Sequence, residues 1–179
     1  MASNESKKQL IKDNIKSYPD FPKPGVIFRD IFSVLQNPEI FAVLKDLLIY
    51  SAKSFAVRPD VVVALDSRGF LFGTLVALDL QIPFVPIRKK GKLPGPKKTA
   101  EYSLEYGTDT LEISTDAIEQ GSNVLIVDDL LGTGGTLQTA CSLVKDVGGN
   151  VSGCLVVIEL KEFNGRAKIK CPLMSLVQY

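Results

Sequence analysis

The strongest chemical signal in the sequence is the stretch from Val124 to Thr136, which reads VLIVDDLLGTGGT. An apolar run ends in two adjacent carboxylates, Asp128 and Asp129, and a loop of glycine and threonine follows. Backbone N–H groups at the start of a helix bind phosphate, and paired carboxylates accept hydrogen bonds from a vicinal diol. The pattern predicts a phosphorylated ribose, with its hydroxyls at the two aspartates and its phosphate at the loop from Thr133 to Thr136.

Two other phosphate-binding motifs are excluded here. The loop lacks the Gly-Lys-Ser/Thr ending of a P-loop, and Leu137 stands where a dinucleotide-binding fingerprint has its third glycine. The alternative is a glycine-rich turn between a strand and a helix that binds nothing. The specificity of the motif favours a ligand.

Histidine is absent from the sequence. This excludes Ser-His and Cys-His nucleophile pairs and zinc sites with histidine ligands, so acid–base chemistry falls to carboxylates, lysine or tyrosine. The three cysteines, Cys141, Cys154 and Cys171, form no Cys-x-x-Cys pair. Their odd number suits a reducing compartment, and we expect them to be buried packing residues.

Basic residues occur in two further places. Arg68 lies between a strand-like run and a helix-like run, where it could bind phosphate or simply form an ion pair at the surface. A second group is either a solvated loop or a nucleic-acid surface, and it comprises Arg88, Lys89, Lys90, Lys92, Lys97 and Lys98. The formal net charge of +1 and the lack of aromatic residues within the group argue against nucleic acid.

The elements that must position these residues alternate between strands and helices. Apolar runs at 60–65, 83–87, 124–127 and 151–160, with a weaker one at 174–178, predict five strands. Helices are predicted from Pro38, capped by Asn37, over 70–80, and after the 132–136 loop up to Gly148. Continuous apolar strands indicate an α/β fold with a parallel sheet covered on both faces, in which ligands bind at the carboxyl ends of the strands.

Two segments lie outside this alternation. Residues 18–30 carry several prolines among apolar residues and suit an extended segment laid over the sheet. Residues 88–107 form a polar stretch of about 20 residues, a length that in a compact domain indicates a functional lid or disorder.

Length and composition set the class of protein. At 179 residues the chain suits one domain, residues 1–179. The N-terminal residues lack the apolar stretch of a signal peptide, and no apolar run reaches the ~20 residues that span a bilayer. We expect a cytoplasmic protein with neither a membrane nor a nucleic acid as partner.

The loop carries a family signature. The sequence resembles the type I phosphoribosyltransferases, whose signature is two acidic residues, apolar residues, a small residue and then Thr-Gly-Gly-Thr. The matching residues here are Asp128, Asp129, Gly132, Thr133, Gly134, Gly135 and Thr136. Gly132 departs from the alanine of the adenine-using members, which adds backbone freedom without removing a phosphate donor.

Further stretches extend the resemblance over nearly the whole chain, toward the members of this family that use adenine. They are PKPGVIFRD at 22–30, LDSRGFLFG at 65–73, RKKGKLPGP at 88–96 and YSLEYG at 102–107. The resemblance implies purine salvage, in which adenine and phosphoribosyl pyrophosphate give AMP and pyrophosphate. It also implies a parallel-sheet fold with an N-terminal hood at about 18–35, a flexible lid at about 88–107, and a homodimer. Mg²⁺ is then expected as cofactor, held mainly by the substrate and by no direct protein ligand.

On the pyrophosphate side, the resemblance assigns five residues. Ser67, Arg68 and Gly69 match the family's pyrophosphate loop, where the arginine makes a bidentate contact to phosphate. Arg88 and Lys92 match residues that face the pyrophosphate, the arginine commonly from the partner subunit.

On the base side, the resemblance implies that backbone groups of the hood, at Ile27, Phe28 and Arg29, read the edge of adenine. Phe28 would stack on one face of the ring and Leu160 would pack on the other. Glu105 matches a lid glutamate that handles the proton of the purine, a role that is coherent in a chain without histidine.

Two alternatives stay open at this stage. A regulatory module could bind phosphoribosyl pyrophosphate or AMP without turnover, although it would not need Glu105 or the basic lid. The enzyme could also transfer the sugar to another base, because purine choice rests on backbone contacts that side chains do not reveal.

Overall fold

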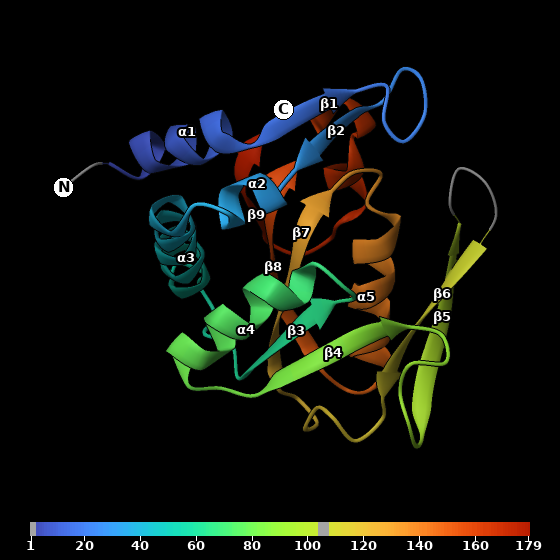
Figure 1. The fold of residues 1–179 in the computed structure, drawn as a ribbon. Helices are drawn as coiled ribbons and strands as arrows, with labels where there is room; N and C mark the ends of the chain where they lie inside the picture. The colour runs from blue at the N-terminus through green and yellow to red at the C-terminus, as the bar shows by residue number, and fades with distance from the viewer. Residues whose placement is uncertain (1–2, 104–107) are drawn as a thin grey trace.

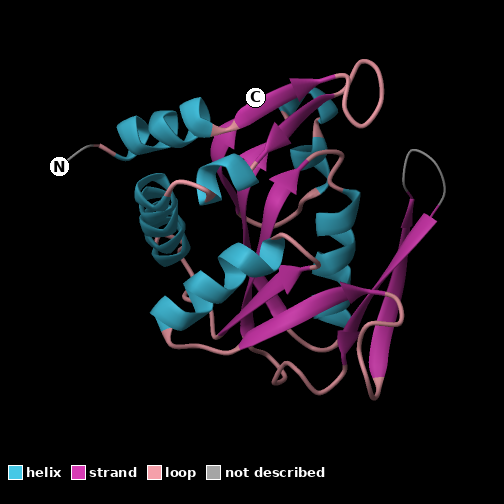
Figure 2. Ribbon diagram, viewed as in Figure 1, coloured by secondary structure: helices cyan, strands magenta, loops and turns pink. Residues whose placement is uncertain are grey.

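A computed structural model describes residues 3–103 and 108–179 of the chain. A large twisted sheet lies between two layers of helices, and a small two-stranded sheet lies beside one end of it (Figures 1 and 2). The expected α/β architecture with a parallel central sheet is confirmed.

The large sheet has seven strands in the order β5-β6-β4-β3-β7-β8-β9. Its parallel part contains the five predicted strands, which are β3 (Val61–Leu65), β4 (Phe84–Lys89), β7 (Asn123–Leu131), β8 (Asn150–Glu159) and β9 (Leu173–Gln178). The prediction of a sheet of only five strands was wrong, because β5 (Lys97–Ser103) and β6 (Thr108–Ser114) extend it as an antiparallel pair beside β4.

The parallel strands read as continuous apolar runs because both of their faces are covered. In β3, Val62 and Ala64 face one core cluster, and Val61, Val63 and Leu65 face another. The first cluster lies under three helices, α1 (Asn4–Asn14), α3 (Pro38–Lys53) and α4 (Gly69–Leu80). The second lies under α5 (Gly135–Asp146) on the opposite face (Figure 1).

Helix α3 begins as the sequence predicted. The Asn37 side chain accepts hydrogen bonds from the backbone of Glu39 and Ile40, and Pro38 occupies the first turn. Helix α1 was not predicted, because Ile11 is the one residue of this polar helix that becomes buried. Its N-terminus is capped by the side chain of Ser3.

The extended N-terminal segment forms a small sheet of its own. Strands β1 (Lys16–Pro19) and β2 (Ile27–Asp30) pair antiparallel, with Tyr18 opposite Phe28. The short helix α2 (Phe32–Leu35) follows and leads toward the large sheet.

The segment 88–107, expected as one long loop, is largely strand in its described part. Strand β4 runs to Lys89, and β5 starts at Lys97. The turn between them is held by the buried Glu112, which accepts backbone hydrogen bonds from Gly91, Lys92 and Leu93 at 2.6–3.1 Å. Burial alone would raise the pKa of Glu112, but these donors hold it below its ordinary value. The sequence concealed this arrangement because one carboxylate, distant in sequence, organises the turn.

The C-terminal end of β8 is tied to the segment that follows it. Short 3₁₀ turns, η1 (Lys161–Phe163) and η2 (Gly165–Lys168), lie between β8 and β9. The buried Glu159 accepts two hydrogen bonds from Arg166 of η2, at 2.8 and 2.6 Å, and one from Ser175 of β9 at 2.6 Å. The carboxylate therefore fixes η2 against the edge of the sheet.

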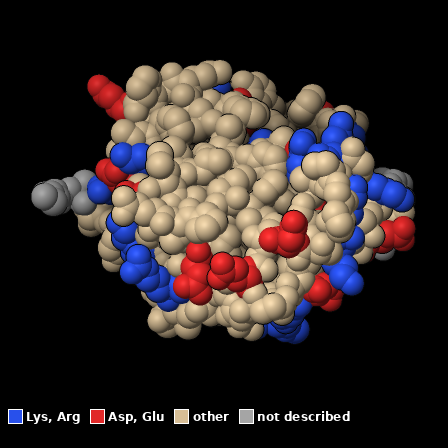
Figure 3. Space-filling view, turned by 90° about the horizontal axis from the view of Figure 1, so that it is seen from below, with Lys and Arg blue, Asp and Glu red and all other residues tan. Residues whose placement is uncertain are grey.

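No helix in residues 3–103 and 108–179 is long and apolar enough to cross a membrane. Seen from below, the molecule shows lysines and arginines mainly around the edge of that face, with acidic side chains among them (Figure 3). That face therefore presents no uniformly basic field of the kind that attracts nucleic acid.

Replacing Glu159 tests whether this carboxylate holds the C-terminal segment in place. Arg166 lowers its pKa from 4.5 to about 2 against the opposing effect of burial. A lowered pKa stabilises the fold above the ordinary value and loses that contribution as pH falls through the folded value. At about pH 7, Glu159→Gln should lower the free energy of unfolding by about 2–3 kcal/mol, the usual scale for losing a charged partner from such a network.

Urea denaturation at neutral pH and near pH 3 measures this effect, with the exposed Glu119→Gln as control. The difference between wild type and Glu159→Gln should shrink in acid, because the wild-type carboxylate then loses its advantage. An equal difference at both pH values would contradict an ionised Glu159.

Candidate active site

A cavity of about 600 Å³ opens where the carboxyl ends of β3 and β7 meet the N-terminus of α5. Five separate stretches of the chain contribute to its wall. The lining residues are Phe32, Asp66, Ser67, Arg68, Lys89, Tyr102, Asp128, Asp129, Leu130, Leu131, Gly132, Thr133, Gly134, Thr136 and Leu137. The structure therefore gathers part of the predicted sugar, phosphate and pyrophosphate set around one space. These residues are Ser67, Arg68, Asp128, Asp129, Gly132, Thr133, Gly134 and Thr136.

The acidic pair lies at the buried end of β7. Asp129 is buried and Asp128 half-buried, and the Asp128 carboxylate accepts the backbone N–H of Asp129 at 2.9 Å. Burial, and then the charge of Asp129, raises the pKa of Asp128 well above its ordinary value. Burial also raises the pKa of Asp129, although Arg68 offsets part of this effect. Burial thus disfavours full ionisation of the pair, and hydroxyl donors or a cation in the cavity would stabilise its charged form.

Arg68 supplies the nearest positive charge. Its Nε lies 2.7 Å from Oδ2 of Asp129, and its side chain is one-third exposed. The next residue, Gly69, is buried against β7, where an added Cβ would lie 2.9 Å from the carbonyl oxygen of Val127 and 3.0 Å from Oδ1 of Asp128. Only glycine lets the 66–69 loop approach the acidic pair so closely.

The 132–136 loop lines the cavity and leads into α5. Gly134 takes the left-handed conformation at the helix start, with φ at 80°, and no described side chain caps this end. Uncapped N–H groups and the helix dipole make the site favourable for an anion. Gly135 is the first residue of α5, and Thr133 and Thr136 line the cavity beside it.

Gly165 is a site residue that the sequence analysis missed. A Cβ on Gly165 would overlap the carbonyl oxygen of Gly132 and crowd the backbone of Thr133 and Gly134. The loop therefore rests directly on η2, which Glu159 holds in place. A single glycine outside any motif gives no sequence signal for this role.

Tyr102 and Lys89 also line the cavity and were not assigned a role from sequence. The Tyr102 hydroxyl donates to Asp109 at 3.3 Å and lies against Thr136, while Lys89 pairs with Asp109 at 3.2 Å. Burial raises the pKa of Tyr102 above its ordinary value, so the hydroxyl remains a donor. Strands β4 and β5 therefore bring Lys89 and Tyr102 to the cavity beside the 132–136 loop.

The remaining basic residues are partly engaged inside the protein. Arg88 pairs with Asp66, next to the predicted pyrophosphate loop, at 3.0 Å, and Lys97 donates to the carbonyl of Leu93 at 2.7 Å. Lys92 is exposed on the turn held by Glu112. Among the described residues, neither Arg88 nor Lys92 lines the cavity itself.

The predicted base-reading residues lie apart from the cavity wall. Among described residues, the small N-terminal sheet and α2 reach the cavity through Phe32, and Ile27, Phe28, Arg29 and Leu160 are not among its lining. Phe28 packs edge-on against Phe21, with ring centroids 5.2 Å apart. The Arg29 guanidinium lies 3.9 Å above the Tyr179 ring.

Glu105, the predicted proton-handling residue, lies outside the described residues. The strands on either side of it are placed: β5 and β6 pair from Lys97 opposite Ser114 to Ser103 opposite Thr108.

Comparison with known proteins agrees with this geometry. Residues 31–174 match the phosphoribosyl transferase domain. Adenine phosphoribosyltransferase from Drosophila pseudoobscura pseudoobscura is 49% identical, covering 99% of this chain and 98% of its own, and the human enzyme is 48% identical, covering 98% of each.

A solved structure of an adenine phosphoribosyltransferase also matches this chain. Adenine phosphoribosyltransferase from Saccharomyces cerevisiae, complexed with an iminoaltritol bisphosphate and adenine, superposes with a TM-score of 0.91. It is 42% identical and covers 96% of this chain and 98% of its own. The domain match covers most of the chain, the relatives match over nearly their full length, and the fold is shared. The chain therefore belongs to the adenine phosphoribosyltransferase family of type I phosphoribosyltransferases.

Proposed function

We propose that this phosphoribosyltransferase transfers the phosphoribosyl group of phosphoribosyl pyrophosphate to adenine, giving AMP and pyrophosphate in purine salvage. The observation that carries the proposal is the single cavity that joins a buried acidic pair, Arg68 and the uncapped start of α5. The yeast relative that binds adenine together with a sugar-like bisphosphate supports the same pairing of ligands.

The sugar and its 5′-phosphate occupy the β7–α5 junction. Asp128 and Asp129 accept hydrogen bonds from the ribose hydroxyls, and the backbone from Gly132 to Thr136 binds the phosphate. Supporting this, burial makes the charged form of the acidic pair costly without further hydrogen-bond donors, and no described side chain caps the N–H groups at the helix start. Because the acidic pair binds the hydroxyls and the start of α5 binds the phosphate, the sugar can enter the cavity in only one orientation.

The pyrophosphate leaves toward the 66–69 loop. Ser67 and Gly69 offer close backbone approach, and Arg68 exchanges its contact with Asp129 for a bidentate contact to phosphate oxygens. Arg88, held beside this loop by Asp66, and Lys92 add positive charge.

Mg²⁺ fits this site as a partner of the substrate. The acidic pair offers oxygen ligands, which Mg²⁺ prefers, but Arg68 already engages Asp129. We infer that substrate oxygens hold most of the ion, which offsets charge on the departing pyrophosphate when bound.

The base lies on the hood side of the cavity. Residues 18–35 form this hood, in which backbone groups of Ile27, Phe28 and Arg29 read adenine while Leu160 packs on the ring. These residues lie away from the cavity wall in the structure, so the proposal includes movement of the hood or lid toward bound adenine. Glu105, on the lid at 88–107, accepts the proton that the purine sheds as its nitrogen bonds to the sugar. Closure over the reacting groups also excludes water, which would hydrolyse the activated sugar.

We propose that the chain, one domain over residues 1–179, works as a cytoplasmic homodimer. Exposed apolar side chains support a contact with a second copy: Leu78 on α4 is 79% exposed, and Leu71 on the same helix is 39% exposed. Helix α4 is apolar around most of its circumference, a feature of helices that are covered on more than one side.

A panel of bases tests the reaction. With phosphoribosyl pyrophosphate and Mg²⁺, we expect nucleotide to form from adenine and little to form from guanine, hypoxanthine or uracil. Chromatography of the reaction mixtures measures the nucleotide formed. Tight AMP binding without turnover of any base would instead favour a regulatory module, and preference for another base would refute the choice of adenine.

The double variant Asp128→Asn, Asp129→Asn should lower kcat/KM at least about 100-fold, because each charge-assisted hydrogen bond contributes about 1.5–3 kcal/mol.

Arg68→Lys tests the bidentate phosphate contact. Lysine keeps the positive charge but lacks the planar fork, so kcat/KM for phosphoribosyl pyrophosphate should fall roughly 10- to 100-fold. Arg58→Lys, an exposed arginine distant from the cavity lining, serves as the control. Wild-type KM and kcat in Arg68→Lys would remove Arg68 from the pyrophosphate site.

Glu105→Gln tests proton transfer. Glutamine keeps the shape and hydrogen bonding but cannot act as a base, so single-turnover rates with adenine should fall about 10²- to 10⁴-fold. AMP affinity should change much less. Glu101→Gln, an exposed glutamate on β5, is the matched control, and a rate within about threefold of wild type would leave Glu105 as a lid residue only.

A further inference from the structure

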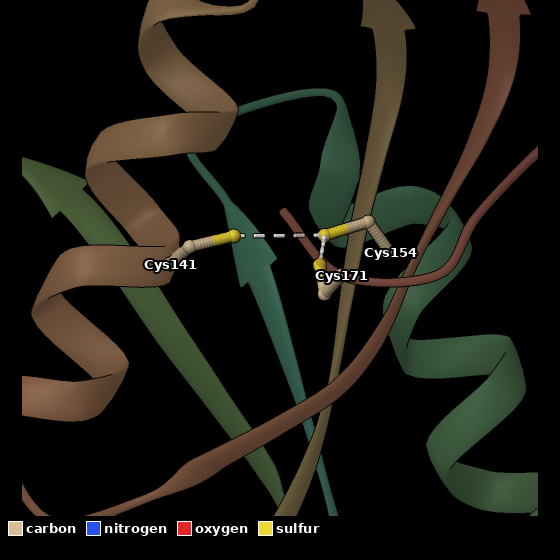
Figure 4. Close-up of side chains that lie close together, drawn as sticks. All are labelled: Cys141, Cys154 and Cys171. Carbon is tan, nitrogen blue, oxygen red and sulfur yellow. Dashed lines mark hydrogen bonds between the residues drawn. The ribbon is translucent and has the colours of Figure 1, made fainter. Parts of the chain in front are cut away.

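The three cysteines of the chain meet at one point on the α5 side of the sheet (Figure 4). Cys141 lies on α5, Cys154 on β8, and Cys171 in the segment between η2 and β9. Their sulfurs point toward one another, with 3.7 Å between Cys141 and Cys154 and 3.5 Å between Cys154 and Cys171. The three sulfurs all lie within 4.8 Å of one another.

From the sequence, we expect all three cysteines to be buried packing residues. Cys154 is fully buried, but Cys141 and Cys171 are half-buried. Thiols that only fill space need not converge from three different elements. The sulfur-to-sulfur distances are also far longer than the about 2.05 Å of a disulfide bond.

The spacing suits metal coordination. Two thiolates on a tetrahedral zinc ion, each about 2.3 Å from the metal, lie about 3.8 Å apart. The two shorter distances therefore need only a few tenths of an ångström of adjustment, and the third pair closes to the same spacing. Sulfur-only donor sets select thiophilic ions.

A bound cation would change the charge balance of the cluster. The Cys154 thiol favours the ionised form of Cys141, but Cys171 and burial together raise the pKa of Cys141 to about 12, so metal binding must displace the thiol protons. Three thiolates around a divalent cation carry one net negative charge, which the Lys145 ammonium, acting on both Cys141 and Cys171, partly offsets. Three sulfur ligands leave the fourth position of a tetrahedral ion to water, as in zinc sites with three protein ligands.

We propose that Cys141, Cys154 and Cys171 bind a thiophilic divalent cation of the zinc class. Each thiol that binds gives its proton to solvent as its sulfur–metal bond forms, with no change of oxidation state. The bound ion links α5, β8 and the segment before β9. This site is separate from the sugar-binding cavity, and the inference is independent of the catalytic proposal.

Cobalt(II) is the first probe, used with the full-length reduced protein freed of metal. A tetrahedral thiolate site gives sulfur-to-cobalt charge-transfer absorption in the ultraviolet and strong visible bands, saturating at one ion per chain. The acidic pair at Asp128 and Asp129 has only oxygen donors and cannot give the charge-transfer band. All thiolate signal must come from the cluster, because the chain has three cysteines and they are all in it.

Zinc provides the second measurement. Added Zn²⁺ should displace cobalt and bleach these bands, and at a hundredfold excess over its Kd it should raise the unfolding midpoint by about 5–10 °C. Cys141→Ser and Cys171→Ser, at half-buried positions, should each weaken binding at least about tenfold, which at the same Zn²⁺ concentration lowers the shift to about half or less. Circular dichroism and AMP affinity establish that each variant is folded.

The wild-type titration can overturn the proposal without any variant. Absence of a charge-transfer band in reduced wild-type protein would refute the site. A full-strength band in a folded Cys171→Ser variant would refute its three-cysteine composition.

Discussion

Two adjacent carboxylates at the buried end of β7 are the constraint around which the site is arranged. Removing carboxylates from water is costly unless charge and hydrogen bonds compensate, and here one arginine, Arg68, serves two acids. The raised pKa values of Asp128 and Asp129 show that compensation is incomplete. In the proposed function, a ligand rich in hydroxyl donors and accompanied by a cation would supply what the protein alone does not.

That arrangement depends on close backbone packing on both sides of the acidic pair. Gly69 allows the 66–69 loop to lie against β7, and Gly165 allows η2 to lie beneath the phosphate loop. Neither contact tolerates a larger residue without movement of backbone. Glu159 then fixes η2 through Arg166, so a carboxylate beyond the cavity lining determines the position of the surface that supports the phosphate loop.

Features that depend on residues close together in sequence could be predicted, whereas features that depend on residues far apart in sequence could not. The 132–136 loop and the acidic pair before it could be located because strand, acidic pair and helix start are contiguous in sequence. The parallel strands were predictable because burial on both faces makes them continuously apolar. Gly165, Tyr102 and Glu112 act on residues distant in sequence, so nothing local distinguishes them. Strand β5 was missed for the same reason, since its register is set by pairing with β6 and by a turn that Glu112 organises. The base contacts assigned to the hood remain predictions, because they are mainly backbone groups that side-chain patterns do not encode.

The segment from η1 to Cys171 connects the two chemical centres of the molecule. Gly165 supports the phosphate loop, and Cys171, six positions further on, completes the sulfur cluster against Cys141 of α5. The same helix begins at the phosphate loop and carries Cys141 on its second turn. A cation that fixes Cys171 to α5 would therefore restrain both supports of that loop in their packed positions. If sugar-phosphate binding favours the same packing, linkage requires the effect to be mutual: each ligand strengthens the binding of the other by the same factor.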